Sequence, residues 1–320
     1  MGYNRRIKIR REVHCLMDAL IQSLVQANFA PERIAPQASM AHYTTLRIGG
    51  PAEVMVNIHS ADEIAVALRA AKQADAPVTI IGNGSNLLVR DGGIRGLVLR
   101  ISGGLNAIRR EGDCLLVQAG ASLAAVAAFA RDEGLSGMAE LGGIPGTVGG
   151  GVLMNAGAYG AELAQLVTQA EGVSLSDGRR VIYPADRLDF AYRHSALMDA
   201  GVVITQATLA LTPGDPEAIR ARMEECAKAR REKQPLTLPS AGSTFKRPEG
   251  HFAAKLIDDC GLRGLTVGGA QVSEKHAGFI VNIGGATARD MLELMRQVEQ
   301  RVFEQTGVQL EPEVRILGED

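Results

Sequence analysis

The residues with the clearest chemical potential in this chain are glycines, which gather in two clusters. The first is "IIGNGSNLLV" at residues 80–89, and the second is "LGGIPGTVGGGVLMNAGAYG" at residues 141–160. The second cluster contains eight glycines and no Asp, Glu, Lys or Arg. Glycine loses more conformational entropy on folding than any other residue, so such a run needs a reason. Bare backbone lets N–H groups converge on an anion such as a pyrophosphate, and uncharged backbone suits a flat redox-active ring.

Several kinds of site compete for these clusters. A Rossmann dinucleotide site is disfavoured: in "GNGSNL" Leu87 stands where the third glycine belongs, "LLV" reads as a strand, and no acid lies near residue 104. A P-loop is excluded, because no G-x4-G-K-[ST] string occurs. A pyrophosphate held by loop backbone between strands suits both clusters. Ordinary tight turns remain open for "GNGSN" and are a weaker explanation of the longer run.

Composition places the chain among ordinary globular proteins. Its 320 residues predict roughly two domains at about 150 residues each. The net charge of -2 gives no reason to expect a nucleic-acid or membrane partner, and no apolar run is long enough to span a bilayer. The four cysteines form no C-x-x-C and no H-E-x-x-H occurs, so we expect neither a disulfide framework nor a metal site. The first residues predict a basic tail followed by an amphipathic helix, without the apolar core of a targeting signal.

The pattern of elements is mixed throughout, which predicts an α+β fold. Residues 60–75 predict a helix opened by a capping box of Ser60 and Glu63. A hairpin is expected around Asp177-Gly178. Proline and glycine accumulate near residue 213, which suggests a boundary there. The other expected strands are 52–58, 76–82, 96–101, 114–120, 201–213, 277–282 and 313–317, and the other expected helices are 122–134, 215–233, 251–261 and 287–307.

Seven motifs in one order add a resemblance to a known family. They are "TTLRIGGPAEV", "IGNGSNLLV", "GIPGTVGGGVLMNAGAYG", "FAYRHS", "PSAGSTFKRP", "GGAQVSEKHAGFIVN" and "LEPEVRILG". Together they resemble the UDP-N-acetylenolpyruvoylglucosamine reductases, the MurB flavoenzyme family of peptidoglycan synthesis. The resemblance covers residues 43–318. The spacing between "FAYRHS" and "AGSTFKRP" is short and leaves no room for an extra lid loop, as in the family's second, shorter subtype.

The resemblance implies a PCMH-type FAD-binding domain of two α/β subdomains at residues 44–212. It also implies a C-terminal α+β substrate-binding domain at 213–306. Before them lies an N-terminal tail and helix, 1–43. After them, 307–320 supplies a strand that carries Glu313 and returns to the FAD-binding part. The second glycine cluster has no His or Cys, so the FAD is expected to be non-covalent.

The implied reaction has two halves. NADPH reduces FAD, and the flavin then gives hydride to C3 of UDP-N-acetylglucosamine enolpyruvate while a proton goes to C2. The product is UDP-N-acetylmuramate. The resemblance further implies a cytosolic, monomeric enzyme with a small-molecule substrate and no nucleic-acid or membrane partner.

The family's catalytic residues map onto Arg193 of "FAYRHS", Ser243 of "AGSTFK" and Glu313 immediately before "VR". An arginine stays charged and grips a carboxylate with directed donors, which suits the charge that hydride addition creates. A serine hydroxyl is a poor acid, so its role as proton donor depends on geometry and a relay. Glu311 would share a strand face with Glu313, so the two are easily confused. Without the resemblance, an exposed arginine and a turn serine would be the plainer interpretations.

The resemblance also suggests binding residues. The expected substrate ligands are Tyr192, Lys246, His276 and Asn282, although a structural role is the plainer interpretation of the histidine from the residues alone. Two rival functions stay open: an oxidase of a small alcohol or sugar on the same fold, and a flavin or nucleotide sensor. The expected FAD ligands are Asn83, Gly84, Ser85, Asn86, Gly143, Ile144, Pro145, Gly146, Gly150 and Ala156.

Overall fold

The structure is a computed structural model that describes residues 17–320. The chain folds into two compact units. Of the described residues, unit 1 holds 17–38, 52–82 and 95–223. Unit 2 holds 39–51, 83–94 and 224–320. Segments 39–51 and 83–94 therefore fold together with the C-terminal third of the chain. Each unit has a hydrophobic core of its own.

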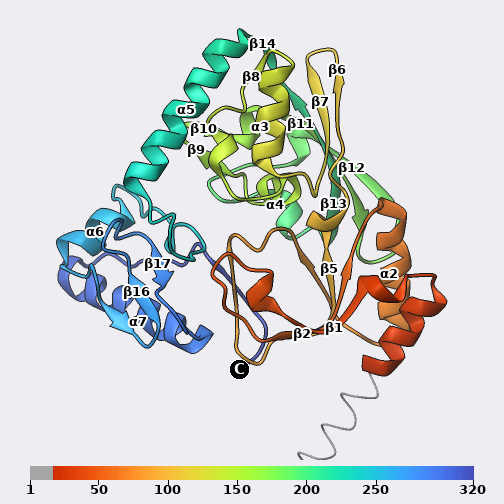
Figure 1. The fold of residues 1–320 in the computed structure, drawn as a ribbon, viewed down its shortest axis with the longest axis horizontal. Coiled ribbons are helices and arrows are strands. Elements are labelled where there is room, and N and C mark those ends of the chain that lie inside the picture. Colours follow the sequence, from red (N-terminus) through yellow and green to blue (C-terminus); the bar gives the residue numbers. More distant parts are fainter. Residues whose placement is uncertain (1–16) are drawn as a thin grey trace, which may run out of the picture. The chain divides into compact units, whose positions relative to one another are not determined.

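Unit 1 contains a four-stranded sheet in the order β1-β2-β5-β3 (Figure 1). Strand β3 runs parallel to β5. Helix α2 (Ala61–Gln73) turns Ile64, Ala67, Leu68 and Ala71 inward, the spacing of a helix with one apolar face. The strands are β1 (Ile34–Ser39), β2 (Pro51–Asn57), β3 (Val78–Ile81) and β5 (Ile94–Arg100).

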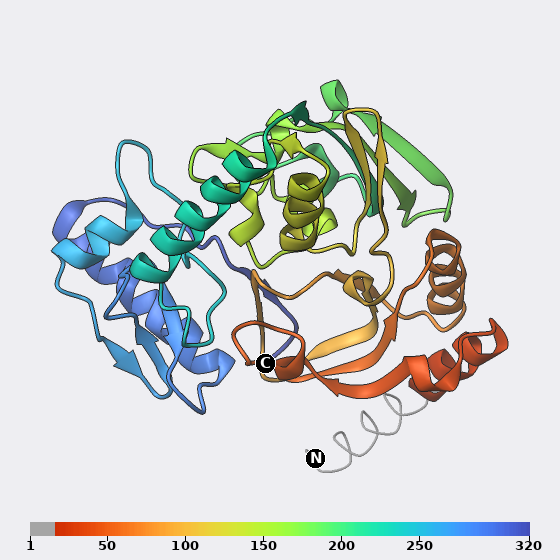
Figure 2. The same cartoon turned by 45° about the horizontal axis from the view of Figure 1, so that its top comes forward.

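Unit 1 also contains an antiparallel five-stranded sheet in the order β12-β11-β13-β7-β6. Figures 1 and 2 show helices α3 (Leu123–Asp132) and α4 (Val148–Leu153) beside this sheet. The hairpin between β11 and β12 turns at Gly178, as predicted. The strands are β6 (Ile108–Glu111), β7 (Cys114–Gln118), β11 (Val167–Ser174), β12 (Arg180–Pro184) and β13 (Val202–Ala210), with two short pairs, β8 (Leu135–Ser136) with β14 (Thr212–Pro213) and β9 (Gly157–Ala158) with β10 (Ala161–Glu162).

Unit 2 is smaller. Helix α7 (Ala288–Thr306) turns Met291, Leu294, Val298 and Val302 into the core and ends at Gly307, whose φ of 72° suits a helix C-cap. Helix α6 is Ala253–Asp259, and α5 (Pro216–Lys233) leads into the unit. A three-stranded sheet joins β15 (Thr266–Val267), β16 (Ala270–Val272) and β17 (Ile280–Asn282), and β4 (Leu87–Val89) runs parallel to β18 (Arg315–Leu317).

The α+β prediction is confirmed, and most expected elements are present within a few residues. Two local predictions need correction. Ser60 caps α2 by accepting from the Glu63 N–H over 3.3 Å, but the Glu63 carboxylate accepts from the His59 N–H and pairs with Arg33 instead of closing the box. The last strand begins at Arg315 and not at residue 313.

The N-terminal helix is described from residue 17 to 26, and its Leu20 and Leu24 are buried, as an amphipathic helix requires. The predicted basic tail and Cys15 lie outside the described residues. Within 17–320, no helix is long and apolar enough to cross a membrane.

Candidate functional site

The glycine-rich run of unit 1 has a buried and an accessible side. Thr147 and Val148 are buried where α4 begins, and the Thr147 hydroxyl accepts from the Gly150 N–H over 3.3 Å. The residues predicted to bind FAD are on the accessible side. Gly143, Pro145 and Gly150 are exposed, and Ile144, Gly146 and Ala156 are partly exposed.

The glycines of this run serve two purposes. A Cβ at Gly149 would lie 2.9 Å from the Cβ of Ala119, and one at Gly151 would lie 2.8 Å from Cδ1 of Leu163. These two glycines are needed for α4 to pack closely. A Cβ at Gly150 would meet nothing nearer than the Thr147 hydroxyl at 3.4 Å. Part of the glycine content is therefore structural, while Gly150 leaves accessible backbone that a ligand could approach.

The two glycine clusters meet within unit 1 at Gly82, which follows β3. A Cβ at Gly82 would lie 2.5 Å from the Thr147 hydroxyl oxygen, so only glycine lets these segments touch. The Ser102 hydroxyl donates to the Gly82 carbonyl over 3.2 Å and fixes this point from the other side. Residue 82 of the first cluster and residue 147 of the second are therefore in contact within unit 1.

The continuation of the first cluster belongs to unit 2. Gly84 has a φ of 63°, and any Cβ there would collide with the carbonyl of Tyr43. The Thr45 N–H donates to the Gly84 carbonyl over 3.2 Å. Asn83, Ser85 and Asn86 around it are partly exposed. The strand β4 that follows excludes the helix of a Rossmann site, as the sequence indicated.

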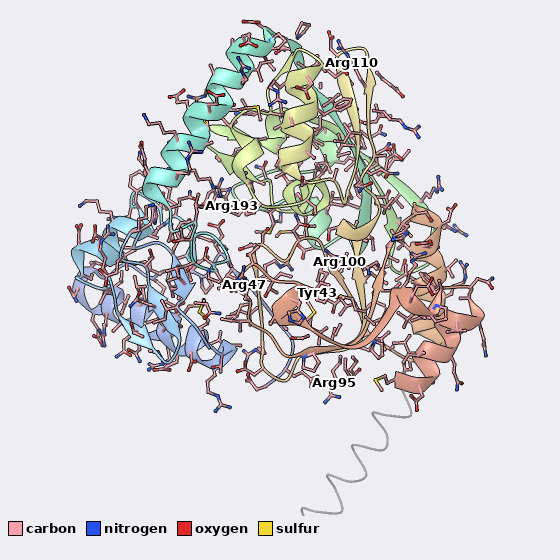
Figure 3. All side chains as sticks on the ribbon, viewed as in Figure 1. Tyr43, Arg47, Arg95, Arg100, Arg110 and Arg193 are labelled. Atoms are coloured by element: carbon pink, nitrogen blue, oxygen red, sulfur yellow. The ribbon has the colours of Figure 1, made fainter. Side chains whose placement is uncertain are left out.

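Segment 39–51, which carries Tyr43 (labelled in Figure 3), supports this loop but received no site assignment from the sequence. The signal was present in the motif "TTLRIGG". Its contact with Gly84 joins segments about forty residues apart.

Ser243 and Glu313 lie on hydrogen-bonded segments of unit 2. The Glu313 N–H donates to the Thr244 carbonyl over 2.8 Å, and Phe245 pairs with Pro312 in antiparallel fashion. Thr244 is buried, and its hydroxyl accepts from the Ile280 N–H over 3.0 Å. Ser243 is exposed, directly before this anchored residue. The structure thus brings two of the three predicted catalytic residues together.

The two carboxylates of "EPEVR" have different surroundings. They precede β18 and flank Pro312, which pairs with Phe245, and the shared face expected for them stays a prediction. Glu311 is exposed, and its carboxylate pairs with the Lys246 ammonium over 3.2 Å. Glu313 is half-buried. Lys246, a predicted substrate ligand, therefore already has a partner on the protein surface.

Arg193 belongs to unit 1 and lies in a tight turn (labelled in Figure 3). Ala191 and His194 close the turn with two backbone hydrogen bonds of 3.2 Å. Arg193 has a φ of 55°, an uncommon backbone conformation for a residue with a side chain. Its guanidinium carbon lies 5.1 Å from the ring centroid of Tyr192, a cation–π distance. Tyr192 is exposed and Arg193 half-buried, so both are accessible to a ligand.

The remaining predicted substrate ligands make contacts within the protein. His276 Nδ1 accepts from the Gly278 N–H over 3.2 Å, and its ring packs edge-on against Phe279. Burial lowers the pKa of His276 below its usual value, which favours the neutral ring. The Asn282 amide donates to the Leu46 carbonyl over 3.1 Å, and its oxygen accepts from the Gly284 N–H over 2.9 Å. Both side chains have structural roles, and their contact with substrate stays a prediction.

Residues 17–320 contain no group of three or more His, Cys, Asp or Glu that could hold a metal ion. One polar residue that the sequence did not single out is Asn155. It is buried inside the glycine-rich motif and is bonded to the turn that carries Arg193. The sequence signal that could have identified Asn155 is a single asparagine within a glycine-rich run.

Comparison with known proteins gives two family matches. The model of a FAD binding domain matches residues 52–182, which include both glycine clusters. The model of the UDP-N-acetylenolpyruvoylglucosamine reductase C-terminal domain matches residues 234–317, which include Ser243 and Glu313.

Individual relatives agree with these matches. The UDP-N-acetylenolpyruvoylglucosamine reductase of Pediococcus pentosaceus is 47% identical over 93% of this chain and 99% of its own. That of Levilactobacillus brevis is 47% identical over 91% of this chain and 95% of its own. The crystal structure of MurB from Thermus caldophilus has a TM-score of 0.76 and 38% identity, covering 88% of this chain and 97% of its own.

Proposed function

Because this chain belongs to the UDP-N-acetylenolpyruvoylglucosamine reductase family, we propose that it reduces UDP-N-acetylglucosamine enolpyruvate to UDP-N-acetylmuramate, with bound FAD and with NADPH as hydride donor. This reaction provides a precursor of peptidoglycan. The structural observation that best supports the assignment of roles is the hydrogen bonding between the segments of Ser243 and Glu313. These segments carry a hydroxyl and a carboxylate, the groups that a proton relay needs.

The residues present fit a flavin dinucleotide. In unit 1, the accessible backbone at Gly143, Pro145 and Gly150 offers uncharged polar groups. A Cβ at Gly150 would meet no close protein atom, so a ligand can approach the backbone there. In unit 2, Asn83, Ser85 and Asn86 are partly exposed, while Gly84 between them is buried. When bound, FAD would supply the hydride chemistry between NADPH and the enolpyruvyl group. The protein's contribution is to bind and orient this group.

Arg193 is assigned to the substrate carboxylate. The double bond of an enol ether is electron-rich, so hydride addition at C3 is favourable only if the developing negative charge is stabilised. The charge spreads into the carboxylate, and a guanidinium can hold both oxygens with directed N–H donors. The tight turn at Ala191–His194 fixes the backbone from which the Arg193 side chain extends.

Ser243 is assigned as the proton donor to C2, and Glu313 as the group that orients the intermediate or relays the proton. A serine hydroxyl is a weak acid at neutral pH, so its position close to C2 must make proton transfer possible. Thr244, buried and bonded on both sides, holds the Ser243 backbone in place. Glu313 is preferred over Glu311 because Glu311 is exposed and paired with Lys246.

The wider assignments follow the family. Residues 44–212 are proposed as the FAD-binding domain and 213–306 as the substrate-binding domain, with 307–320 contributing Glu313. The proposal also includes a monomer in the cytosol, where its nucleotide-linked substrate and NADPH occur, without a nucleic-acid or membrane partner.

The experiment that tests the function is identification of the product. The purified protein is incubated with NADPH and UDP-N-acetylglucosamine enolpyruvate, and the sugar nucleotide is analysed by mass spectrometry and chromatography against authentic UDP-N-acetylmuramate. We expect the substrate to gain one hydride and one proton and to co-elute with that standard. An unchanged sugar nucleotide with oxygen consumed in the presence of a small alcohol or sugar would instead support the oxidase alternative.

A further inference from the structure

A buried asparagine links the glycine-rich run to the turn that carries Arg193. Asn155 is 1% exposed and has a φ of 44°. Its amide nitrogen donates to the Ala191 carbonyl and to a Glu162 carboxylate oxygen, each over 3.0 Å, and its amide oxygen accepts from the Ala164 N–H over 2.9 Å. Both amide protons and the oxygen therefore have partners, all inside unit 1.

The other flank of the turn is fixed in the same way. Ser195 is fully buried, and its hydroxyl donates to the Leu153 carbonyl at the end of α4 over 2.8 Å. The Tyr192–Arg193 turn is thus held before and after by buried polar side chains. Both anchor it to the segment 153–155.

These contacts are specific to an asparagine. Only a side chain with two donors and one acceptor can satisfy Ala191, Glu162 and Ala164 together. Asparagine also tolerates a left-handed backbone better than most residues. Leaving the buried amide of Asn155 unpaired is costly, so its bond to the Ala191 carbonyl favours one position of the turn.

We propose that Asn155 is a positioning residue that sets the place of Arg193 through the Ala191 carbonyl. It does not touch the reacting atoms. The proposal rests on the role proposed above for Arg193, since Arg193 needs a fixed position only if it stabilises a transient charge. A misplacement of about 1 Å can reduce a rate about 10²-fold.

The first test is Asn155→Asp, which keeps the shape, the tolerance of positive φ and the acceptor for Ala164 but removes both donors. Anaerobic stopped-flow absorbance measures flavin reduction by NADPH and flavin reoxidation by the enolpyruvyl substrate separately. We expect unchanged FAD affinity and reduction, and reoxidation about 10²-fold slower at saturating substrate. Weaker FAD binding as the main effect would overturn the proposal, because Asn155 would then act through the flavin loop.

A second variant separates stability from positioning. Asn155→Asp combined with Glu162→Gln restores a donor–acceptor pair between positions 155 and 162 and removes the like charges. It does not restore the bond from position 155 to the Ala191 carbonyl, which still accepts from the His194 N–H. We expect this double variant to regain most of the free energy of unfolding and to remain slow in reoxidation. Full recovery of the reoxidation rate would contradict positioning through Ala191.

A double-mutant comparison with Arg193→Lys completes the test. If Asn155 acts through Arg193, adding Asn155→Asp to Arg193→Lys slows reoxidation no further, whereas independent residues would give multiplied effects. Multiplied effects would overturn this inference alone. A normal rate in Arg193→Lys would instead refute the role of Arg193 in the proposed function.

Thr205→Val is the matched control, because it removes a buried hydroxyl bonded to the Glu171 carbonyl over 3.2 Å in the same unit. We expect it to lower stability without slowing reoxidation.

Discussion

The side-chain amide of Asn86 donates to the backbone carbonyl of Glu313 over 3.1 Å, although 227 positions separate the two residues. The Arg315 N–H donates in turn to the Asn86 carbonyl over 3.0 Å, and β4 and β18 continue this contact as parallel strands. One loop that is expected to meet the flavin therefore also holds the backbone of the proposed catalytic carboxylate. This arrangement makes Glu313 the better positioned of the two tail acids.

Substitution of each tail acid in turn can distinguish the role of Glu313 from that of Glu311. Glu313→Gln keeps the backbone contacts and removes the charge, so we expect flavin reoxidation by substrate to slow by about 10²- to 10⁴-fold, the range of general acid–base effects. Glu311→Gln removes an exposed ion pair with Lys246. It should change stability by no more than about 1 kcal/mol and leave the rate nearly unchanged. Steady-state and single-turnover rates of both variants measure these effects. A larger loss of rate in Glu311→Gln than in Glu313→Gln would show that Glu311, and not Glu313, is the catalytic carboxylate.

The hydroxyl of Ser243 is expected to matter for only one half of the reaction. In Ser243→Ala, NADPH should still reduce the flavin at the normal rate, because no proton donor to C2 is needed there. Reoxidation by the enolpyruvyl substrate should fall by about 10²- to 10⁴-fold. Ser240→Ala is the control in the same loop, where the backbone carbonyl and not the hydroxyl accepts from Thr45. If both half-reactions of Ser243→Ala run at full rate, Ser243 is not the donor.

The two kinds of glycine can be distinguished by adding one methyl group. Gly150→Ala meets no close atom within the protein, so the apoprotein should keep its stability or gain about 0.5–1 kcal/mol. FAD should bind about 10- to 100-fold more weakly, the effect of losing a hydrogen bond to a charged group. Gly149→Ala should instead lower the free energy of unfolding by about 1–3 kcal/mol, because its Cβ would crowd Ala119.

Urea unfolding of the two apoproteins and titration with FAD, followed by flavin fluorescence, measure both quantities. Normal FAD affinity in Gly150→Ala would remove that residue from the cofactor site.

The half-buried His276 of unit 2 predicts a pH dependence of stability. Burial lowers the pKa of His276, so between its folded and unfolded values the unfolded chain binds more protons. The free energy of unfolding must then fall as pH drops below about 6.5, and this loss ends once pH is below the folded pKa. We expect the wild type to lose more stability than His276→Gln between about pH 7.5 and about pH 5.5. Urea unfolding at both pH values measures this, and equal losses would show that His276 is not the cause.

Local sequence signals predicted most elements, because the interactions that decide them are short-range. Ser60 and Ser122 cap α2 and α3 where expected. The turn at Gly178 follows from its need for positive φ. Where a side chain had a long-range partner, the local rule failed: Arg33 lies thirty residues from Glu63 and pairs with the carboxylate that the capping box would have used.

The sequence motifs predicted which residues belong to the candidate site, but not the contacts and burial of those residues. The resemblance suggested Ser243 and, from its place before "VR", Glu313. The half-buried position of Glu313 and the pairing of Glu311 with Lys246 depend on contacts that no local pattern encodes. The folding of segments 39–51 and 83–94 with the C-terminal third was equally hidden, because it rests on non-local strand pairing. The role of Asn155 appears only when its three partners are seen together.

The most direct test of the central claim is an anaerobic absorbance spectrum of the purified protein. It is recorded alone, after NADPH and then after UDP-N-acetylglucosamine enolpyruvate. The account predicts a flavin spectrum that bleaches with NADPH and returns when the enolpyruvyl sugar is added. A colourless protein that binds no added FAD, or a flavin that NADPH does not bleach, would contradict it.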